Sequence, residues 1–178
     1  MSDPALSPDL KELAFVGVAR DGQQDVYVAS LRGGQARRLT NDPYTKRDLA
    51  WGADGIYLSS DATDHGQTNL FRLDPASGAP TRLTTAPASD RHPSPLPDGG
   101  VLYSSDAGGK LDLYLLKEGA IQQVTDFTTG LASPALAAKG RGVLATTFHG
   151  GTFRLVEVPK VAWLEGTPVP VPPPQGQV

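Results

Sequence analysis

Short runs of alternating apolar and polar residues, each closed by a turn, fill the N-terminal part of the chain. Turns rich in Gly, Asp and Pro separate these runs, which lie at residues 13–16, 25–28 and 38–40. Period-two alternation broken by Gly and Asp is typical of β-hairpins. Residues 7–40 are therefore predicted to form one four-stranded antiparallel unit. Residues 1–6 have weak strand character but are a candidate for an inner strand.

The same pattern returns along the chain at a nearly constant spacing. A turn aspartate and a terminal threonine mark the copies, at Asp9, Asp54, Asp98, Thr40, Thr84 and Thr125. The aspartates are 45 and 44 residues apart, and the threonines are 44 and 41 residues apart. A four-stranded unit of roughly 40–45 residues has the period of a β-propeller blade. A fourth copy, from residue 138 to 156, lacks the terminal Leu-Thr pair.

This period predicts an all-β fold, a β-propeller built of four-stranded antiparallel blades, with about four blades present. The blades are placed at residues 1–45, 46–88, 89–130 and 131–160. Beyond residue 160 the alternation stops, and five of the last eleven residues are proline. Such a composition favours an extended chain, so residues 161–178 are predicted to be a Pro-rich C-terminal tail or linker.

The segments SPDLKELAF, DVYV and RRLT, with their echoes ADGIYLSSD, PDGGVLYSSD and TRLT, resemble the TolB-type β-propeller repeat. The resemblance covers residues 7–158, and the same repeat occurs in the propellers of prolyl-oligopeptidase-like peptidases. It implies a propeller of six or seven blades, so we expect the four blades to be part of a larger propeller. A true four-bladed propeller, or one completed by self-association, is the alternative.

Charge and composition exclude several classes of function. Acidic and basic residues are interspersed with a net charge of −3, which argues against a nucleic-acid footprint. The absence of cysteine excludes disulfides and thiolate metal sites. No apolar run approaches the roughly 20 residues of a membrane span, so direct membrane insertion is not expected. Residues 1–9 lack the features of a signal peptide, although the TolB resemblance implies the periplasm or cell envelope.

Candidate chemistry is weak throughout the sequence. The pairs Ser59-Ser60 and Ser104-Ser105 fall inside predicted strands, and no Gly-x-Ser-x-Gly motif is present. We therefore predict no catalytic residue and no enzymatic activity in this chain. The glycines at residues 108–109 are expected in a hairpin turn and not in a phosphate-binding loop, and no cofactor is predicted.

A metal site is not predicted either. The three histidines, His65, His92 and His149, lie on different blades and form no closely spaced pair. The densest polar cluster, at residues 61–65, lacks the full pattern of a calcium loop.

Repeated acidic positions are expected to be structural, since a position present in every blade cannot be a single active site. The aspartates that mark the turns can accept local backbone N–H groups. A second repeated set opens the third strand of each blade and is expected to tie the preceding loop, at Asp25, Asn69 and Asp112.

One end of the propeller is the better candidate for a contact surface. Because successive strands are antiparallel, the link into each blade and the loop between its second and third strands lie at the same end. That end carries all three histidines, and loops on a rigid scaffold often carry function. The predicted partner-binding residues, on the loops nearest the inner strands, are Arg47, Asp48, Asp90, Arg91 and His92.

The expected function is a non-catalytic scaffold for protein–protein interaction in the bacterial cell envelope, as the TolB resemblance implies. The alternative is the accessory propeller of a prolyl-oligopeptidase-like serine peptidase whose catalytic domain is not in this chain. A third hypothesis, binding of a sugar or small ligand, would need Tyr44, Trp51 and Trp163 as stacking platforms. Nothing in the sequence gathers these three, and Trp51 is expected to pack between blades.

Overall fold

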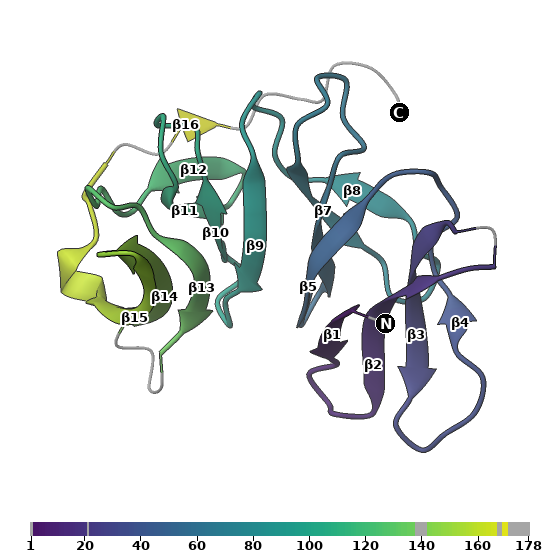
Figure 1. Cartoon of the computed structure of the whole chain (residues 1–178). Helices are drawn as coiled ribbons and strands as arrows, with labels where there is room; N and C mark the ends of the chain where they lie inside the picture. The colour runs from purple at the N-terminus through teal and green to yellow at the C-terminus, as the bar shows by residue number, and fades with distance from the viewer. Residues whose placement is uncertain (1, 21, 138–141, 167–168, 171–178) are drawn as a thin grey trace.

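The computed structural model describes residues 2–20, 22–137, 142–166 and 169–170. Four antiparallel sheets follow one another in an arc (Figure 1), and the regular structure of these residues is β-strand apart from one 3-10 turn. The elements, in chain order, are β1 (Ser2–Leu6), β2 (Glu12–Val18), β3 (Gln24–Ser30), β4 (Arg37–Arg38), β5 (Lys46–Gly52), β6 (Gly55–Ser60), β7 (Asn69–Leu73), β8 (Pro80–Arg82), β9 (Asp90–Pro95), β10 (Val101–Ser105), β11 (Asp112–Lys117), β12 (Ala120–Gln123), β13 (Ala132–Leu136), β14 (Gly142–His149), β15 (Thr152–Pro159), the 3-10 turn η2 (Lys160–Ala162) and β16 (Val169–Pro170).

Each sheet is one blade, and the predicted all-β propeller architecture is confirmed. Blade one is β1-β2-β3-β4, blade two is β5-β6-β7-β8, blade three is β9-β10-β11-β12 and blade four is β13-β14-β15. The first strands, β1, β5, β9 and β13, are neighbours in that order along the inner side of the arc (Figure 1). We call these four the inner strands.

Two details of the sequence prediction change. Residues 7–40 contain three strands and not four, because β1 supplies the inner strand of blade one from a segment that looked weak in sequence. Blade four has three strands among the described residues, and the turn expected at residues 138–140 lies outside them.

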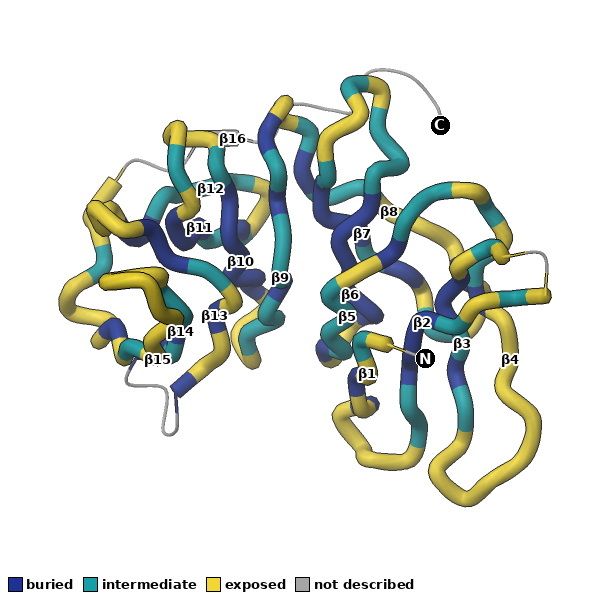
Figure 2. Tube along the Cα trace, viewed as in Figure 1, coloured by how far each residue is buried: buried dark blue, intermediate teal, exposed yellow. Residues whose placement is uncertain are grey.

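The hydrophobic core is divided into layers between neighbouring blades. Val26 and Leu58 belong to the layer between blades one and two, and Trp51 packs against it, as the sequence predicted. Equivalent layers join blades two and three and blades three and four. Figure 2 shows the buried segments concentrated on the middle strands of the sheets, such as β6 and β10, with exposed loops around them. At about 1.5–3 kcal/mol for each large apolar side chain buried, these layers dominate the stability.

The C-terminal segment packs against blade three in the part that the structure describes. Trp163 packs on the core layer between blades three and four, and the backbone N–H of Leu164 donates to the carbonyl oxygen of Val124 at 3.0 Å. Strand β16 then pairs antiparallel with β12, so that blade three becomes a five-stranded sheet. The sequence predicted an extended tail or linker here. The extended segment at residues 169–170 instead pairs with the edge strand β12.

A β-bulge interrupts every inner strand at the same place. The residues concerned have positive φ angles of 52° to 56°, and each register shift includes one of them, namely Asp3, Asp48, His92 and Ser133. They are 45, 44 and 41 residues apart, the same intervals as those of the repeat landmarks. A bulge leaves one residue unpaired and re-aims its side chain. The inner side of the arc is therefore lined by four side chains that ordinary strands would not present.

A close backbone contact between blades one and two occurs at Gly78. This residue lies in the β7–β8 hairpin with φ +78°, and a Cβ there would be 2.0 Å from the Leu39 carbonyl oxygen. We expect Gly78→Ala to lower the free energy of unfolding by about 3–4 kcal/mol, because the clash adds to the left-handed backbone cost. Denaturant unfolding measures this loss.

Gly33→Ala is the matched control for Gly78→Ala. Gly33 has φ +95° but no atom within 4 Å of the added Cβ. Only the backbone cost of about 1–2 kcal/mol should remain. Equal losses in the two variants would contradict the clash.

Candidate interaction site on the inner strands

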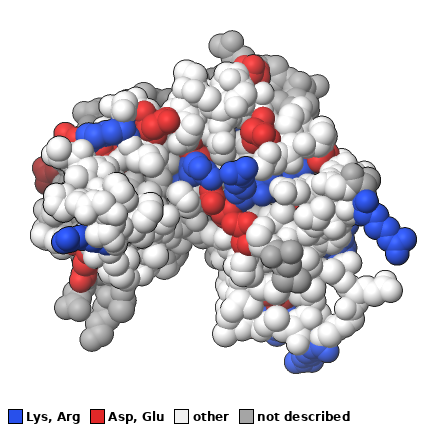
Figure 3. Space-filling model, viewed as in Figure 1, with Lys and Arg blue, Asp and Glu red and all other residues white. Residues whose placement is uncertain are grey.

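Four charged or titratable side chains meet where β5 and β9 begin. Asp48 Oδ2 lies 3.6 Å from Arg91 Nε, and Asp48 Oδ1 lies 3.8 Å from His92 Nε2. Arg47 precedes Asp48 and is exposed. We call Arg47, Asp48, Arg91 and His92 the inner-strand cluster. Figure 3 shows blue and red side chains meeting near the centre of the face, over β5 and β9.

The five residues predicted from sequence lie within strands and not on loops. Arg47 and Asp48 belong to β5, while Asp90, Arg91 and His92 open β9. The structure brings four of them into one cluster across two blades. Asp90 points elsewhere, because it is only 2% exposed and lies against Asn69 of blade two.

Backbone hydrogen bonds between blades hold the bulges in place. The N–H of Asp48 donates to Asp3 Oδ1 at 3.2 Å, and the N–H of His92 donates to Asp48 Oδ2 at 3.3 Å. The N–H of Ser133 turns instead to Ser104 Oγ at 3.0 Å. Sequence reasoning missed Asp3 and the bulges. The regular spacing of Asp3, Asp48 and His92 was the available signal.

A buried ionic latch joins blade one to blade two beneath this surface. Asp25 is fully buried, its Oδ1 accepts the Thr40 hydroxyl at 2.8 Å, and Lys46 Nζ is 3.7 Å away. Burial alone would raise the pKa of Asp25, but hydrogen bonds from Thr40 and Arg38 and the charge of Lys46 lower it overall. Lys46, 3% exposed, is also held by Asp42 at 2.5 Å.

The joint between blades two and three uses the opposite arrangement. Asn69 replaces the aspartate, and its Nδ2 donates to Asp90 Oδ2 at 3.3 Å while its Oδ1 accepts from Arg82 at 2.7 Å. Asp90 is the first residue of β9, and Lys46 is the equivalent first residue of β5. The sequence predicted that Asp25 and Asn69 would tie the preceding loop. Asp25 accepts from Gln23 of that loop at 3.2 Å and Asn69 donates to the Thr68 carbonyl oxygen at 3.2 Å, and both residues also tie the link to the next blade.

The joint between blades three and four is a third version. Asp112 accepts from the Thr125 hydroxyl at 3.0 Å, as Asp25 does from Thr40. Its cation is Lys110, which also ion-pairs with Asp126 at 2.6 Å. The position in blade four that is equivalent to Lys46 and Asp90 is occupied by the apolar Leu131, which is 1% exposed.

Asp90 makes stability depend on pH in an unusual direction. Burial, with a smaller contribution from the charge of Asp106, raises the pKa of Asp90 to about 6. The folded state thus binds more protons than the unfolded state between about pH 4 and pH 6. Stability from this group is present below that window and lost as the pH rises through it. We expect unfolding measurements to show a gain of about 2–3 kcal/mol from Asp90 on acidification across the window.

Asp90→Asn isolates the contribution of this carboxyl. The amide keeps an acceptor for Asn69 and cannot ionise, so the variant should be more stable than the parent at neutral pH. The difference between the two proteins should shrink as the pH falls. A constant difference across the window would contradict a raised pKa.

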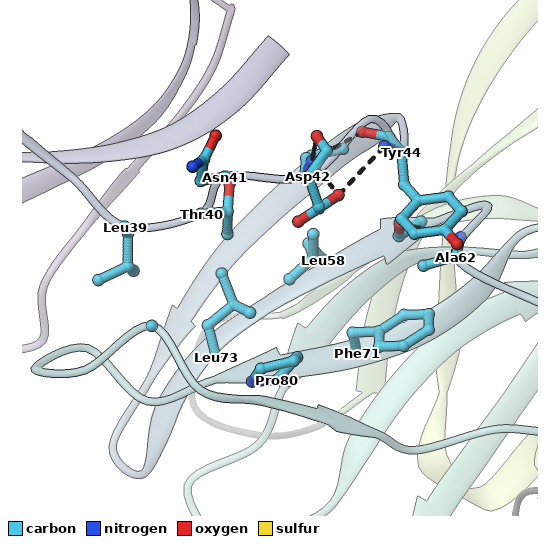
Figure 4. Close-up of a pocket in the computed structure, with 13 residues that line it drawn as sticks. Leu39, Thr40, Asn41, Asp42, Tyr44, Leu58, Ala62, Phe71, Leu73 and Pro80 are labelled. Carbon is cyan, nitrogen blue, oxygen red and sulfur yellow. Dashed lines mark hydrogen bonds and ion pairs between the residues drawn. The ribbon is translucent and has the colours of Figure 1, made fainter. Parts of the chain in front are cut away.

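A mainly apolar cavity of about 390 Å³ opens between blades one and two (Figure 4). Leu39, Leu58, Phe71 and Leu73 point into it, and Tyr44 lies at its rim. The three aromatic residues of the sugar-binding hypothesis are not gathered, since Trp51 packs on the layer between blades one and two and Trp163 on the layer between blades three and four.

The paired serines lie inside strands, and His65 contacts a neighbouring side chain. Ser59, Ser60, Ser104 and Ser105 are buried within β6 and β10. Within the described ranges, no group of three His, Asp or Glu side chains is placed to hold a metal ion. His65 instead lies 3.1 Å from Arg82. In the same part of the chain, no helix is long and apolar enough to cross a membrane.

The repeat, the blades and their inner strands agree with a known family. The model of the PD40 family, the TolB beta propeller domain, matches residues 3–162. The chain therefore belongs to the TolB β-propeller family.

Individual relatives are more distant and longer. TolB from Acinetobacter baumannii matches in structure with a TM-score of 0.76 and 19% identity, over 92% of this chain and 42% of that one. A puromycin hydrolase matches with a TM-score of 0.71 and 21% identity, over 89% of this chain and 27% of that one. These likenesses show the fold alone. In sequence, the uncharacterized peptidase YuxL of Bacillus subtilis (strain 168) is 25% identical over 147 residues, which are 79% of this chain and 20% of the relative.

Proposed function

We propose that the chain is a non-catalytic scaffold for protein–protein interaction and that the inner-strand cluster is its contact surface. The observation that carries the proposal is the meeting of polar groups from two blades, the carboxylate of Asp48 on β5 with the guanidinium of Arg91 and the imidazole of His92 on β9. Bulges and inter-blade hydrogen bonds fix these groups on rigid strands, as a preorganised recognition surface requires. Asp90 is 2% exposed and is therefore left out of the proposed contact surface.

The cell envelope is the proposed location. Membership of the TolB family supports it. The partner would then be an envelope protein.

Charge reversal tests the contact surface. Arg47→Glu and Arg91→Glu should each reduce chemical cross-linking to the envelope partner by about tenfold, the effect of losing about 1.4 kcal/mol of binding. Arg154→Glu, on the exposed strand β15, is the matched control. Thermal unfolding should be unchanged in Arg47→Glu and Arg154→Glu, and Arg91→Glu, which places a carboxylate beside Asp48, should stay folded with a modestly lower melting temperature. An equal loss of cross-linking in the control, or unfolding of the cluster variants alone, would contradict the proposal.

The second candidate is the accessory propeller of a serine peptidase. The B. subtilis relative, named as a peptidase, favours it. Within the described residues no serine hydroxyl is hydrogen-bonded to a histidine, so a catalytic centre would have to lie in another domain. The test is to sequence the whole reading frame of the parent gene. A Gly-x-Ser-x-Gly motif on an α/β pattern supports this candidate, and a complete frame without one removes it.

A further inference from the structure

We propose that Arg47, Arg91 and Ser59 form an oxyanion subsite that takes a carboxylate of the protein partner. This inference rests on the proposed function and deepens it, since it names the chemical group that the surface holds. The three residues line one cavity of about 130 Å³ between β5, β6 and β9. Its remaining walls are Thr45, Ser60, Asp61 and Thr68.

The two arginines have unused hydrogen-bonding capacity. Among the described residues, the Arg47 guanidinium makes no ion pair or hydrogen bond. Arg91 has one ion pair, between its Nε and Asp48 Oδ2 at 3.6 Å. This distance is too long for a hydrogen bond, so the buried Nε–H has no acceptor. Guanidinium groups present N–H donors in a planar fork that matches a carboxylate. Two of them on one small cavity favour an anionic occupant.

Ser59 supplies an independent observation. The residue lines the cavity and is fully buried, and its hydroxyl has no hydrogen-bond partner. At the equivalent place in blade three, Ser104 Oγ accepts the N–H of Ser133. In blade two that task has gone to Asp48, which accepts the N–H of His92. The buried hydroxyl of Ser59 therefore has no hydrogen-bond partner within the protein. Buried hydroxyl groups ordinarily have one, which suggests that a bound group supplies it.

Size and charge restrict the occupant. Pockets for drug-sized ligands usually measure about 300–1,000 Å³, so this cavity suits a single small group and not a sugar ring or nucleotide. The Asp61 carboxylate is not paired with either arginine. It accepts hydrogen bonds from the backbone N–H and the hydroxyl of Thr45 at 2.7 and 2.9 Å. Asp48 is the internal competitor for Arg91. Its removal should therefore strengthen anion binding.

Titrations with small probes test the subsite directly. The blocked tripeptide acetyl-Gly-Glu-Gly-amide, its Gln counterpart and inorganic phosphate are added to the full chain, followed by NMR of the Arg91 Nε–H and the Ser59 backbone amide. The Glu peptide should shift both signals, and the Gln peptide should not. Arg47→Gln and Arg91→Gln should each weaken binding at least about fivefold, because each removes a charged donor. Ser59→Ala should weaken it about twofold.

Two further variants separate the subsite from general charge. Asp48→Asn should tighten binding about threefold, since it removes a competing negative charge yet keeps an acceptor for His92. Arg154→Gln should leave binding unchanged. Unfolding curves of every variant confirm that the fold is intact.

Each other outcome overturns the assignment. Shifts with phosphate alone would mean that the site takes an inorganic oxyanion, and no shift with either probe would mean that water alone fills it. If no probe binds while Arg47→Glu and Arg91→Glu still lose the protein partner, the contact surface stands and the carboxylate subsite falls. If the Glu peptide binds but Arg47→Glu and Arg91→Glu leave partner capture unaffected, the proposed function fails, and the partner's carboxylate falls with it as the occupant of the subsite.

Discussion

Asn69→Asp is expected to lower the free energy of unfolding by about 4 kcal/mol at neutral pH, although aspartate is the residue that blades one and three carry at the same place. The amide nitrogen of Asn69 donates to Ala86 and Ala88 carbonyl oxygens at 3.1 and 3.3 Å, and to Asp90. A carboxylate has no donor for these acceptors and would put a second buried negative charge beside Asp90. Denaturant unfolding measures the loss.

Acidification and a second substitution should each reverse part of that loss. One proton shared between the two carboxyl groups removes the repulsion, so the defect should shrink as the pH falls. The double variant Asn69→Asp/Asp90→Lys creates at this joint the kind of carboxylate–lysine pair that Asp25 and Lys46 form between blades one and two. It should therefore recover part of the stability at neutral pH. Recovery should be partial, because the new lysine has no second carboxylate partner. Asp42 pairs with Lys46 in blade two, but the equivalent residue before blade three is Ala86. A double variant no better than Asn69→Asp would contradict this account of the joint.

Asp25→Ala should lower the free energy of unfolding by about 3 kcal/mol, the lower end for breaking a buried ion pair. The substitution leaves the Thr40 hydroxyl and the buried Lys46 without their shared carboxylate. Asp42 still holds Lys46, which limits the cost. The loss should appear at neutral pH and decrease toward acid, since the pKa of Asp25 is lowered in the folded state. Stability contributed by such a carboxylate is lost as the pH falls through its folded pKa.

Asp112→Ala is the matched control for Asp25→Ala. It removes the same hydrogen bond to a threonine, here Thr125, but its cation Lys110 is 37% exposed. An exposed ammonium that loses its partner is solvated by water, so the loss should be about 1–2 kcal/mol. Equal losses at the two positions would show that the buried position of Lys46 does not matter.

The blades could be predicted from sequence because their signals are local and repeated. Asp54 and Asp98 mark turns, and the alternation between them identifies strands whatever the tertiary context. The expected role of these turn aspartates was only partly right. Asp9 accepts the backbone N–H of Lys11 at 3.2 Å, whereas Asp54 and Asp98 bind Arg72 and Lys117 on a neighbouring strand.

The site could be predicted only by region. The sequence placed Arg47, Asp48, Arg91 and His92 at one end of the propeller, but the bulge that gathers them depends on backbone conformation, which side-chain identity does not reveal. Aspartate, histidine and serine all occupy the positive-φ position. The burial of Asp90 was likewise invisible, because it follows from its pairing with Asn69, 21 residues earlier.

The joints also restrict how this protein could be rearranged in evolution. Repeats of this kind could in principle multiply or disappear as whole blades through duplication and deletion. Here the joints carry different charge combinations, so the blades are not interchangeable modules. Loss of blade two would bring Asp25 against Asp90, two buried carboxylates with no lysine between them. Loss of blade two would therefore need a compensating change in its neighbours, such as a lysine in place of Asp90.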